Sequence, residues 1–124
     1  MQVVTPSPDH VTTTPNAVMT GLAAPSRGST ELSTWQVRMA PGSSGPEHIV
    51  DREQVWTVTA GALEVTAGGR TETLGAGDTL ILPAGVLRQV RTAAEAMEAL
   101  VAMRSDGQVS VPGGAGARPL PWAQ

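Results

Sequence analysis

The middle of the chain alternates apolar and polar residues with a period of two, and this pattern restricts the fold more than any other feature. Trp35, Val37 and Met39 fall on one side of an extended segment, with polar residues between them. The stretches 54–58 and 63–66 alternate in the same way. Successive side chains of a β-strand point to opposite faces, so the pattern predicts strands with one face in a core and the other outside.

Turn-forming residues separate these segments. The chain has 14 glycines and 10 prolines, and many of them lie between short apolar runs. Such a layout favours many short strands joined by turns. Gly68-Gly69 suits a tight hairpin, because both central residues of a primed turn need positive φ. Residues 75–78 predict another turn, and the strand expected at 79–82 ends before Pro83.

The segment 92–104 carries two opposing signals. It is rich in alanine, glutamate, methionine and leucine, which have good helix propensity. Met97, Leu100 and Val101 also fit the i, i+3, i+4 stripe of an amphipathic helix. A surrounding sheet can override such local preferences. The residues of this segment alone leave both a helix and a strand open.

With 124 residues the chain has the length of one domain. We expect an N-terminal arm at 1–15, a folded domain at 16–110 and a loop-like tail at 111–124, because threonine and proline are frequent at the first end and glycine and proline at the second. Phenylalanine and tyrosine are absent, so the core has to be built from aliphatic residues, methionine and the three tryptophans. Trp122 is the residue expected to hold the tail in place.

Composition excludes several kinds of chemistry. There is no cysteine, which excludes disulfides, thiolate metal sites and a cysteine nucleophile. All 8 basic residues are arginine, so no lysine can form a Schiff base or a P-loop. A net charge of −3 without a basic run argues against nucleic acid and anionic membranes. No stretch is apolar enough to span a bilayer and no secretory signal is visible, so we expect a cytoplasmic protein with no membrane partner.

Two spaced sets of residues resemble the paired signatures of the cupin superfamily. Five residues separate the first glycine from a histidine, six separate a glutamine from the second glycine, and five separate the third glycine from a Pro-x-Gly run. Fifteen residues lie between the two motifs, as in compact, single-domain, RmlC-like cupins. The resemblance covers about residues 30–105. The matching positions are Gly42, His48, Gln54, Gly61, Gly77 and Pro83-Ala-Gly85.

The resemblance implies an all-β fold, a single antiparallel β-barrel of jelly-roll (cupin) type that is open at one end. Within such a barrel the segment 92–104 would be a strand. Proteins of this kind usually form dimers, so the resemblance also implies a homodimer.

The resemblance also brings a metal centre into question, because most of its ligand positions are degenerate here. The family uses three histidines and one glutamate, and only the first histidine is kept, as His48. The other positions fall on Val50, Gln54 and Arg88. Valine has no donor atom, a glutamine carbonyl is a weak neutral ligand, and arginine stays protonated and repels a cation. We therefore expect no metal and no other cofactor.

His48 and Arg88 are the candidate catalytic residues. The imidazole of His48 titrates near neutrality and could act as an acid or base, or it could be a remnant hydrogen-bonded to Gln54 or to a backbone carbonyl. By the resemblance, Arg88 points into the barrel. Its guanidinium could hold a carboxylate, phosphate or enolate there, or pair with an internal acid such as Glu47 or Glu98.

Five further residues are candidates for the lining of a ligand pocket, and each is also a candidate core residue. They are Gln54, Trp56, Trp35, Met39 and Met103. The favoured function is a cupin that binds a small organic anion or carbonyl compound. A metal-independent isomerase, epimerase, cyclase or dehydratase is the alternative, with His48 as acid or base and Arg88 as charge stabiliser. A metal-dependent enzyme with unusual ligands, such as a dioxygenase, is a third reading.

Overall fold

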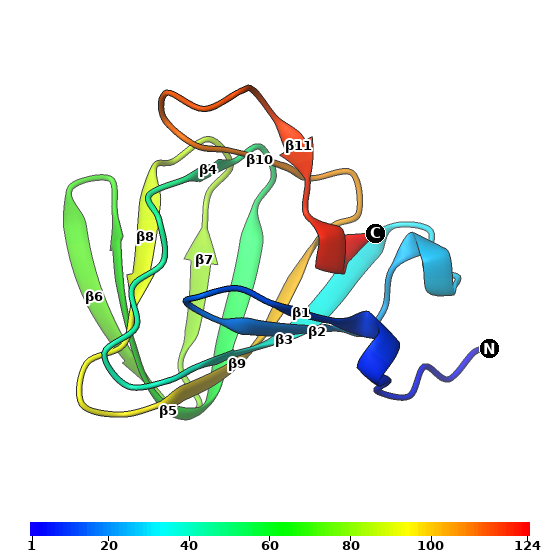
Figure 1. Ribbon diagram of the computed structural model, residues 1–124, viewed down its shortest axis with the longest axis horizontal. Helices are drawn as coiled ribbons and strands as arrows, with labels where there is room; N and C mark the ends of the chain where they lie inside the picture. Colours follow the sequence, from blue (N-terminus) through cyan, green and yellow to red (C-terminus); the bar gives the residue numbers. More distant parts are fainter.

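Antiparallel strands arranged in two facing layers make up the structure, a computed structural model that describes residues 1–124 (Figure 1). The all-β prediction is confirmed. Three single-turn 3₁₀-helices accompany the strands: η1 (Pro8–His10), η2 (Pro25–Arg27) and η3 (Pro121–Ala123). The strands are β1 (Val11–Thr13), β2 (Val18–Gly21), β3 (Leu32–Met39), β4 (Ile49–Val50), β5 (Gln54–Ala67), β6 (Arg70–Gly75), β7 (Thr79–Leu82), β8 (Arg88–Arg91), β9 (Met97–Arg104), β10 (Gln108–Ser110) and β11 (Arg118–Pro119).

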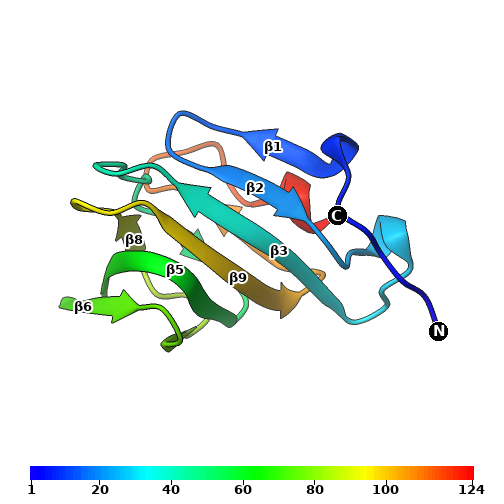
Figure 2. The ribbon, with the colours of Figure 1, turned by 90° about the horizontal axis from the view of Figure 1, so that it is seen from below.

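Strand β5 belongs to both layers. Its first half pairs with β9 and β7, and β9 continues through β3 and β2 to β1. Its second half pairs with β6 and β8 in the other layer. The register of β5 against β9 shifts between Val58 and Ala60, at a β-bulge just before Gly61. Such a bulge bends a strand, which lets β5 turn from one layer into the other (Figure 2).

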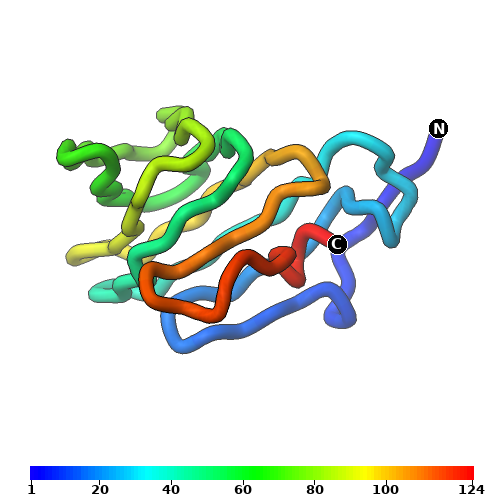
Figure 3. Tube along the Cα trace, turned by 90° about the horizontal axis from the view of Figure 1, so that it is seen from above, coloured from blue at the N-terminus to red at the C-terminus, as the bar shows by residue number.

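The second layer continues beyond β8. The segment 43–48 runs antiparallel to β8, with bridges at Ser44–Arg91 and His48–Arg88. It leads into β4, which pairs with β10, and β10 pairs with β11. The chain ends in η3, which packs against β1, β2 and β3 (Figure 3). No helix of the structure has the length and apolar character needed to cross a bilayer.

The buried faces of the strands meet between the layers, where the alternating residues predicted that they would. Trp35, Val37 and Met39 of β3 are buried, with exposed fractions of 2%, 4% and 3%. Trp56 and Val58 of β5 are buried beside them, while Thr57 between them is on the other face of the strand. In all, 18 buried apolar residues form one core cluster.

Within the segment 92–104, residues Met97–Arg104 form a strand. The strand implied by the resemblance is therefore confirmed, and the helical interpretation is wrong. Strand β9 pairs with β3 along its whole length and with β5 on its other edge. Its odd-numbered residues are buried and its even-numbered residues face outward. Hydrogen bonds along both edges and burial of every second residue outweigh a helix propensity of a few tenths of a kcal/mol per residue.

The predicted turns are confirmed, and glycine is required at the hairpin tip 68–69 and at the bulge inside β5. Gly68 and Gly69 have φ of 56° and 77° at the tip of the β5–β6 hairpin. Gly61 has φ of 73°, and a Cβ there would lie 1.7 Å from the carbonyl oxygen of Ala96. The turn at 75–78 is closed by the side chain of Asp78, which accepts a hydrogen bond from the Gly75 amide at 2.9 Å.

Both ends of the chain add elements to the sheets. The N-terminal segment 1–15 contributes η1 and β1, and the C-terminal segment 111–124 contributes β11 and η3. The indole of Trp122 is partly buried against the core. The hydroxyl of Ser33 donates to the carbonyl oxygen of Ala123 at 2.6 Å, which ties η3 to β3.

Candidate functional site

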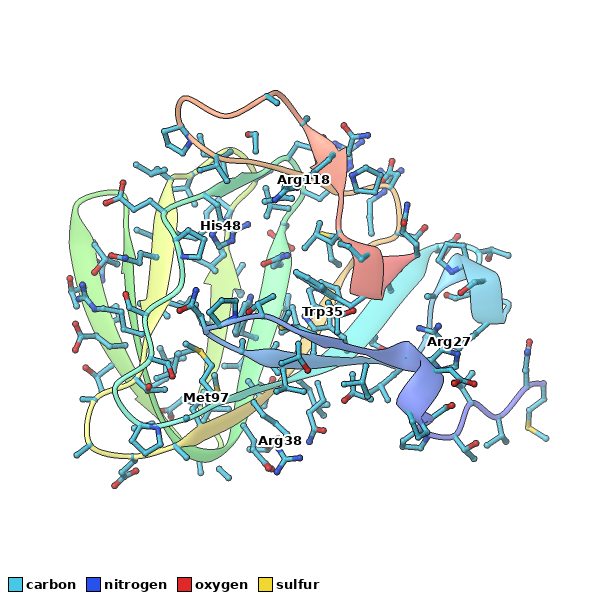
Figure 4. The ribbon with its side chains drawn as sticks, in the orientation of Figure 1. Arg27, Trp35, Arg38, His48, Met97 and Arg118 are labelled. Atoms are coloured by element: carbon cyan, nitrogen blue, oxygen red, sulfur yellow. The ribbon has the colours of Figure 1, made fainter.

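His48 and Arg88 lie directly opposite each other in the second layer. The amide of His48 donates to the carbonyl of Arg88 at 3.0 Å, and the amide of Arg88 donates back at 3.0 Å. Two residues that exchange both backbone bonds present their side chains on the same face of a sheet. Arg88 is only 1% exposed, so this face is the inner one. Figure 4 shows His48 on the segment that leads into β4, in the layer opposite Trp35 of β3.

The guanidinium of Arg88 is enclosed without a partner. Its Nε, Nη1 and Nη2 atoms are all buried and none makes a hydrogen bond. None of the five ion pairs of the chain involves Arg88. Glu98 pairs with Arg38 at 3.2 Å and Glu47 is exposed, so neither forms an internal pair with Arg88. Burial lowers the pKa of Arg88 to about 10, which leaves the group charged at neutral pH.

His48 is held in one tautomer. Its Nδ1 lies 2.9 Å from the carbonyl oxygen of Pro46, and a carbonyl can only accept, so Nδ1 carries the hydrogen. Nε2 therefore has a free lone pair, and it makes no hydrogen bond within the chain. Burial, and secondarily the charge of Arg88, lower the pKa of His48 below its ordinary value of 6.5, although the bond to Pro46 opposes them. The imidazole is thus neutral at pH 7.

Gln54 does not orient His48. Its Oε1 accepts a hydrogen bond from the indole Nε1 of Trp56 at 3.1 Å, and its Nε2 lies 3.5 Å from the sulfur of Met103. Trp35, Met39, Trp56 and Met103 all belong to the core cluster. The structure places these candidates in the barrel interior, and their role in ligand binding stays a prediction.

A hollow of about 330 Å³ opens at the surface and has Arg88 among its lining residues. It lies between the tip of the β5–β6 hairpin and the β7–β8 connection. Its lining residues are Glu47, Thr66, Ala67, Gly68, Gly69, Val86, Leu87, Arg88 and Gln89. Another hollow, of about 390 Å³, lies near Arg104 and Asp106, which pair with each other at 3.3 Å. The first hollow includes Arg88 in its lining, and the guanidinium nitrogens of Arg88 lie beneath that surface, closed off from solvent.

The metal centre of the resembling family does not fit these residues. Val50 is wholly buried and offers no donor atom, and the amide of Gln54 is already engaged. Arg88 would place a positive charge against the cation. Nowhere do three histidine, aspartate or glutamate side chains gather. Asp51, which could have replaced a lost ligand, accepts a hydrogen bond from the Gln108 amide at 2.7 Å instead.

A backbone carbonyl was one of the two hydrogen-bond partners expected for His48, and the structure identifies it as the carbonyl of Pro46. Backbone contacts leave no side-chain pattern in a sequence. The place of Pro46 two residues before His48 is the only signal that could have pointed to it.

Comparison with solved structures shows the same architecture in proteins of distant sequence. The polyketide cyclase RemF from Streptomyces resistomycificus is 19% identical, with a TM-score of 0.71 over 86% of this chain and 72% of that one. Oxalate decarboxylase from Bacillus subtilis is 20% identical, with a TM-score of 0.69 over 77% of this chain and 26% of that one. KdgF from Halomonas sp. is 19% identical, with a TM-score of 0.66 over 75% of this chain and 82% of that one.

No curated protein matches the chain in sequence. The family described as "Cupin domain" matches residues 35–103, which run from β3 to β9 and include both His48 and Arg88. This match spans more than half of the chain and agrees with the two-layered barrel. The chain therefore belongs to the cupin domain family, and its barrel is a cupin barrel.

Proposed function

We propose that this cupin binds a small organic anion in its barrel interior, with Arg88 as the anchor. The observation that carries the proposal is the enclosed guanidinium, whose three nitrogens have no partner. A guanidinium presents its N–H groups as a planar fork that matches a carboxylate in two parallel hydrogen bonds.

The energetics favour the same conclusion. An uncompensated buried charge costs several kcal/mol, and the lowered pKa of Arg88 reflects this cost. An anion held against the guanidinium would supply the missing charge and the missing acceptors together. Oxalate decarboxylase, one of the structural neighbours, is named for a small organic anion, which agrees with a ligand of this class.

Thermal unfolding in the presence of acetate, propionate, lactate and oxalate tests the proposal. A ligand that binds only the folded state raises the Tm with its concentration. We expect this rise for the wild type and for Arg91→Met, a control on the same strand whose arginine is paired with Glu64. We expect no rise for Arg88→Met. Equal responses of wild type and Arg88→Met would refute the proposal.

A metal-independent enzyme is the second candidate function. It is favoured by the position of the neutral His48, with its free Nε2, opposite Arg88. In such an enzyme Nε2 would take a proton from a carbon next to a carbonyl, Arg88 would stabilise the enolate oxygen, and the proton would return. The structural neighbour RemF is described as a polyketide cyclase, an enzyme of carbonyl compounds.

Hydrogen exchange separates an enzyme of this type from a binder. Incorporation of deuterium from heavy water into pyruvate, followed by NMR, should be catalysed by the wild type and lost in His48→Ala. A pure binder would show no exchange above the rate in buffer.

We also propose that two copies of the chain pair through the outer face of the larger sheet. Leu100 of β9 and Ile81 of β7 are 44% and 61% exposed, and they flank Val55 and Thr57 of β5 on this face. The face is about five strand spacings wide, roughly 24 Å, and four outward positions long on β3 and β9, roughly 27 Å. This area approaches the roughly 800 Å² per partner of a stable interface.

The oligomeric state tests the pairing. Light scattering should give a dimer for the wild type and a monomer for the double variant Ile81→Glu, Leu100→Glu. Val111→Glu, at an exposed apolar residue of the tail, is the control and should stay dimeric. A monomeric wild type would refute this proposal and leave anion binding untouched.

A further inference from the structure

Almost every buried polar side chain of the barrel has its hydrogen-bonding capacity engaged. The hydroxyl of Thr92 donates to the Ala40 carbonyl at 2.6 Å and accepts from the Ser43 amide at 2.9 Å. Ser33 donates to a carbonyl of η3, and Gln54 is held by a tryptophan and a methionine. Arg88 is the one buried polar residue of the core that has no partner at all.

The imidazole of His48 is the second group with unused hydrogen-bonding capacity beside Arg88, and it is an acceptor where Arg88 is a donor. Arg88 offers only donors. His48 offers only an acceptor, because Pro46 occupies the Nδ1 hydrogen and leaves the Nε2 lone pair. No other side chain of the chain donates to this nitrogen. The pair therefore presents a fork of unused donors next to one unused acceptor.

One small molecule can satisfy both groups. Directly opposed residues of an antiparallel pair have Cβ atoms only about 4.5–5.5 Å apart, and His48 and Arg88 are opposed in this way. The two side chains therefore leave the sheet side by side on its inner face, so one small ligand can contact both. To satisfy both residues, the ligand needs anionic oxygens that accept from Arg88. It also needs a hydrogen-bond donor on the neighbouring atom, directed at His48.

We infer that the ligands of this site are 2-hydroxycarboxylates, with the carboxylate on the guanidinium of Arg88 and the hydroxyl donating to Nε2 of His48. This inference rests on the proposed anion-binding function and adds the second recognition element. A plain carboxylate leaves Nε2 without a donor. A 2-oxo acid is worse, because it turns a second acceptor toward the lone pair.

Three acids of nearly equal size and equal charge test the inference. Calorimetric titration at pH 7.5 should rank lactate above propionate and propionate above pyruvate. A hydrogen bond of ordinary strength to a partly buried acceptor corresponds to about tenfold in Kd between lactate and propionate. Loss of the acceptor in His48→Phe should bring that ratio from about ten to about one. His48→Gln, which keeps an acceptor oxygen at a similar reach, should retain a preference for lactate.

The possible outcomes distinguish recognition of the hydroxyl by His48 from the proposed binding of an anion by Arg88. Equal affinities for lactate and propionate in a wild type that still depends on Arg88 would overturn only the hydroxyl recognition. A preference for lactate that survives in His48→Phe would overturn the role of Nε2. Absence of binding by all three acids, or binding that persists in Arg88→Met, would overturn anion binding and the ligand class together.

Discussion

Replacing Arg88 by methionine should make the ligand-free protein more stable. Most substitutions of a buried residue destabilise, because they open a cavity or leave a partner unpaired. Arg88 is different: it is 1% exposed, its three nitrogens have no partner, and no acid lies paired with it. Methionine keeps an unbranched apolar stem of similar length and removes only the charged end. The substitution therefore removes the cost of the charge and leaves no other group unsatisfied, against a smaller cost for the space that the guanidinium vacates.

The lowered pKa gives the size of the effect. Burial lowers the pKa of Arg88 from its ordinary value to about 10. Each pKa unit corresponds to about 1.4 kcal/mol, so the charged form is destabilised in the folded state by about 3 kcal/mol. For a chain of 124 residues this corresponds to a rise of about 10 °C in Tm.

The sign of the pH dependence follows from the same shift. The folded-state pKa lies below the unfolded one, so the penalty is fully present below pH 10. It is relieved as the pH rises through 10, because the folded protein loses its proton first. The stability difference between Arg88→Met and the wild type should therefore be largest at neutral pH and should shrink above pH 10.

Urea unfolding of exhaustively dialysed protein at pH 7 measures the difference. Arg91→Met, on the same strand, should be destabilised by at most about 1 kcal/mol, because Arg91 forms a half-exposed ion pair with Glu64. An Arg88→Met variant that is less stable than the wild type by more than about 1 kcal/mol would refute the reasoning. It would mean that the guanidinium already has a stabilising partner inside the chain.

Three further predictions concern the groups around this site and the bend that shapes the barrel. NMR titration should find the pKa of His48 below 6.5, and Arg88→Met should raise it without restoring it fully, because burial is the larger cause. The unfolded chain then takes up the proton first, so this histidine should lower the stability as the pH falls below about 6.5. Gly61→Ala should lower the free energy of unfolding in urea by more than about 3 kcal/mol, because its Cβ would meet a backbone carbonyl at 1.7 Å. Gly77→Ala is the control: its φ is 92° and the space around it is free, so it should cost only about 1–2 kcal/mol of backbone strain. Gln54→Leu should cost about 1–3 kcal/mol, because a buried indole N–H loses its acceptor; an unchanged midpoint would contradict the hydrogen bond.

The strands could be predicted because their causes are local or periodic, and the barrel because the motif spacing resembles the cupin signatures. The alternation of Trp35, Val37 and Met39 marks the buried face of β3, and the paired glycines 68 and 69 mark a hairpin whose tip needs positive φ. The motif spacing of the resemblance brought out His48 and Arg88, and in the structure they oppose each other where the segment 43–48 runs beside β8. These features depend on the order and spacing of residues along the chain, so the sequence alone predicts them.

Three other features depend on tertiary structure: the conformation of the segment 92–104, the pairing of Arg88 and the tautomer of His48. The segment 92–104 has helix propensity, and only the presence of β3 and β5 on its two edges makes Met97–Arg104 a strand. Whether Arg88 is paired depends on which acids face the interior. Glu47 is exposed and Glu98 pairs with Arg38, so neither faces it. The tautomer of His48 depends on a carbonyl that no side-chain pattern encodes. Propensity and spacing act along the chain, whereas pairing, burial and satisfaction of polar groups are set by neighbours that only the folded barrel brings together.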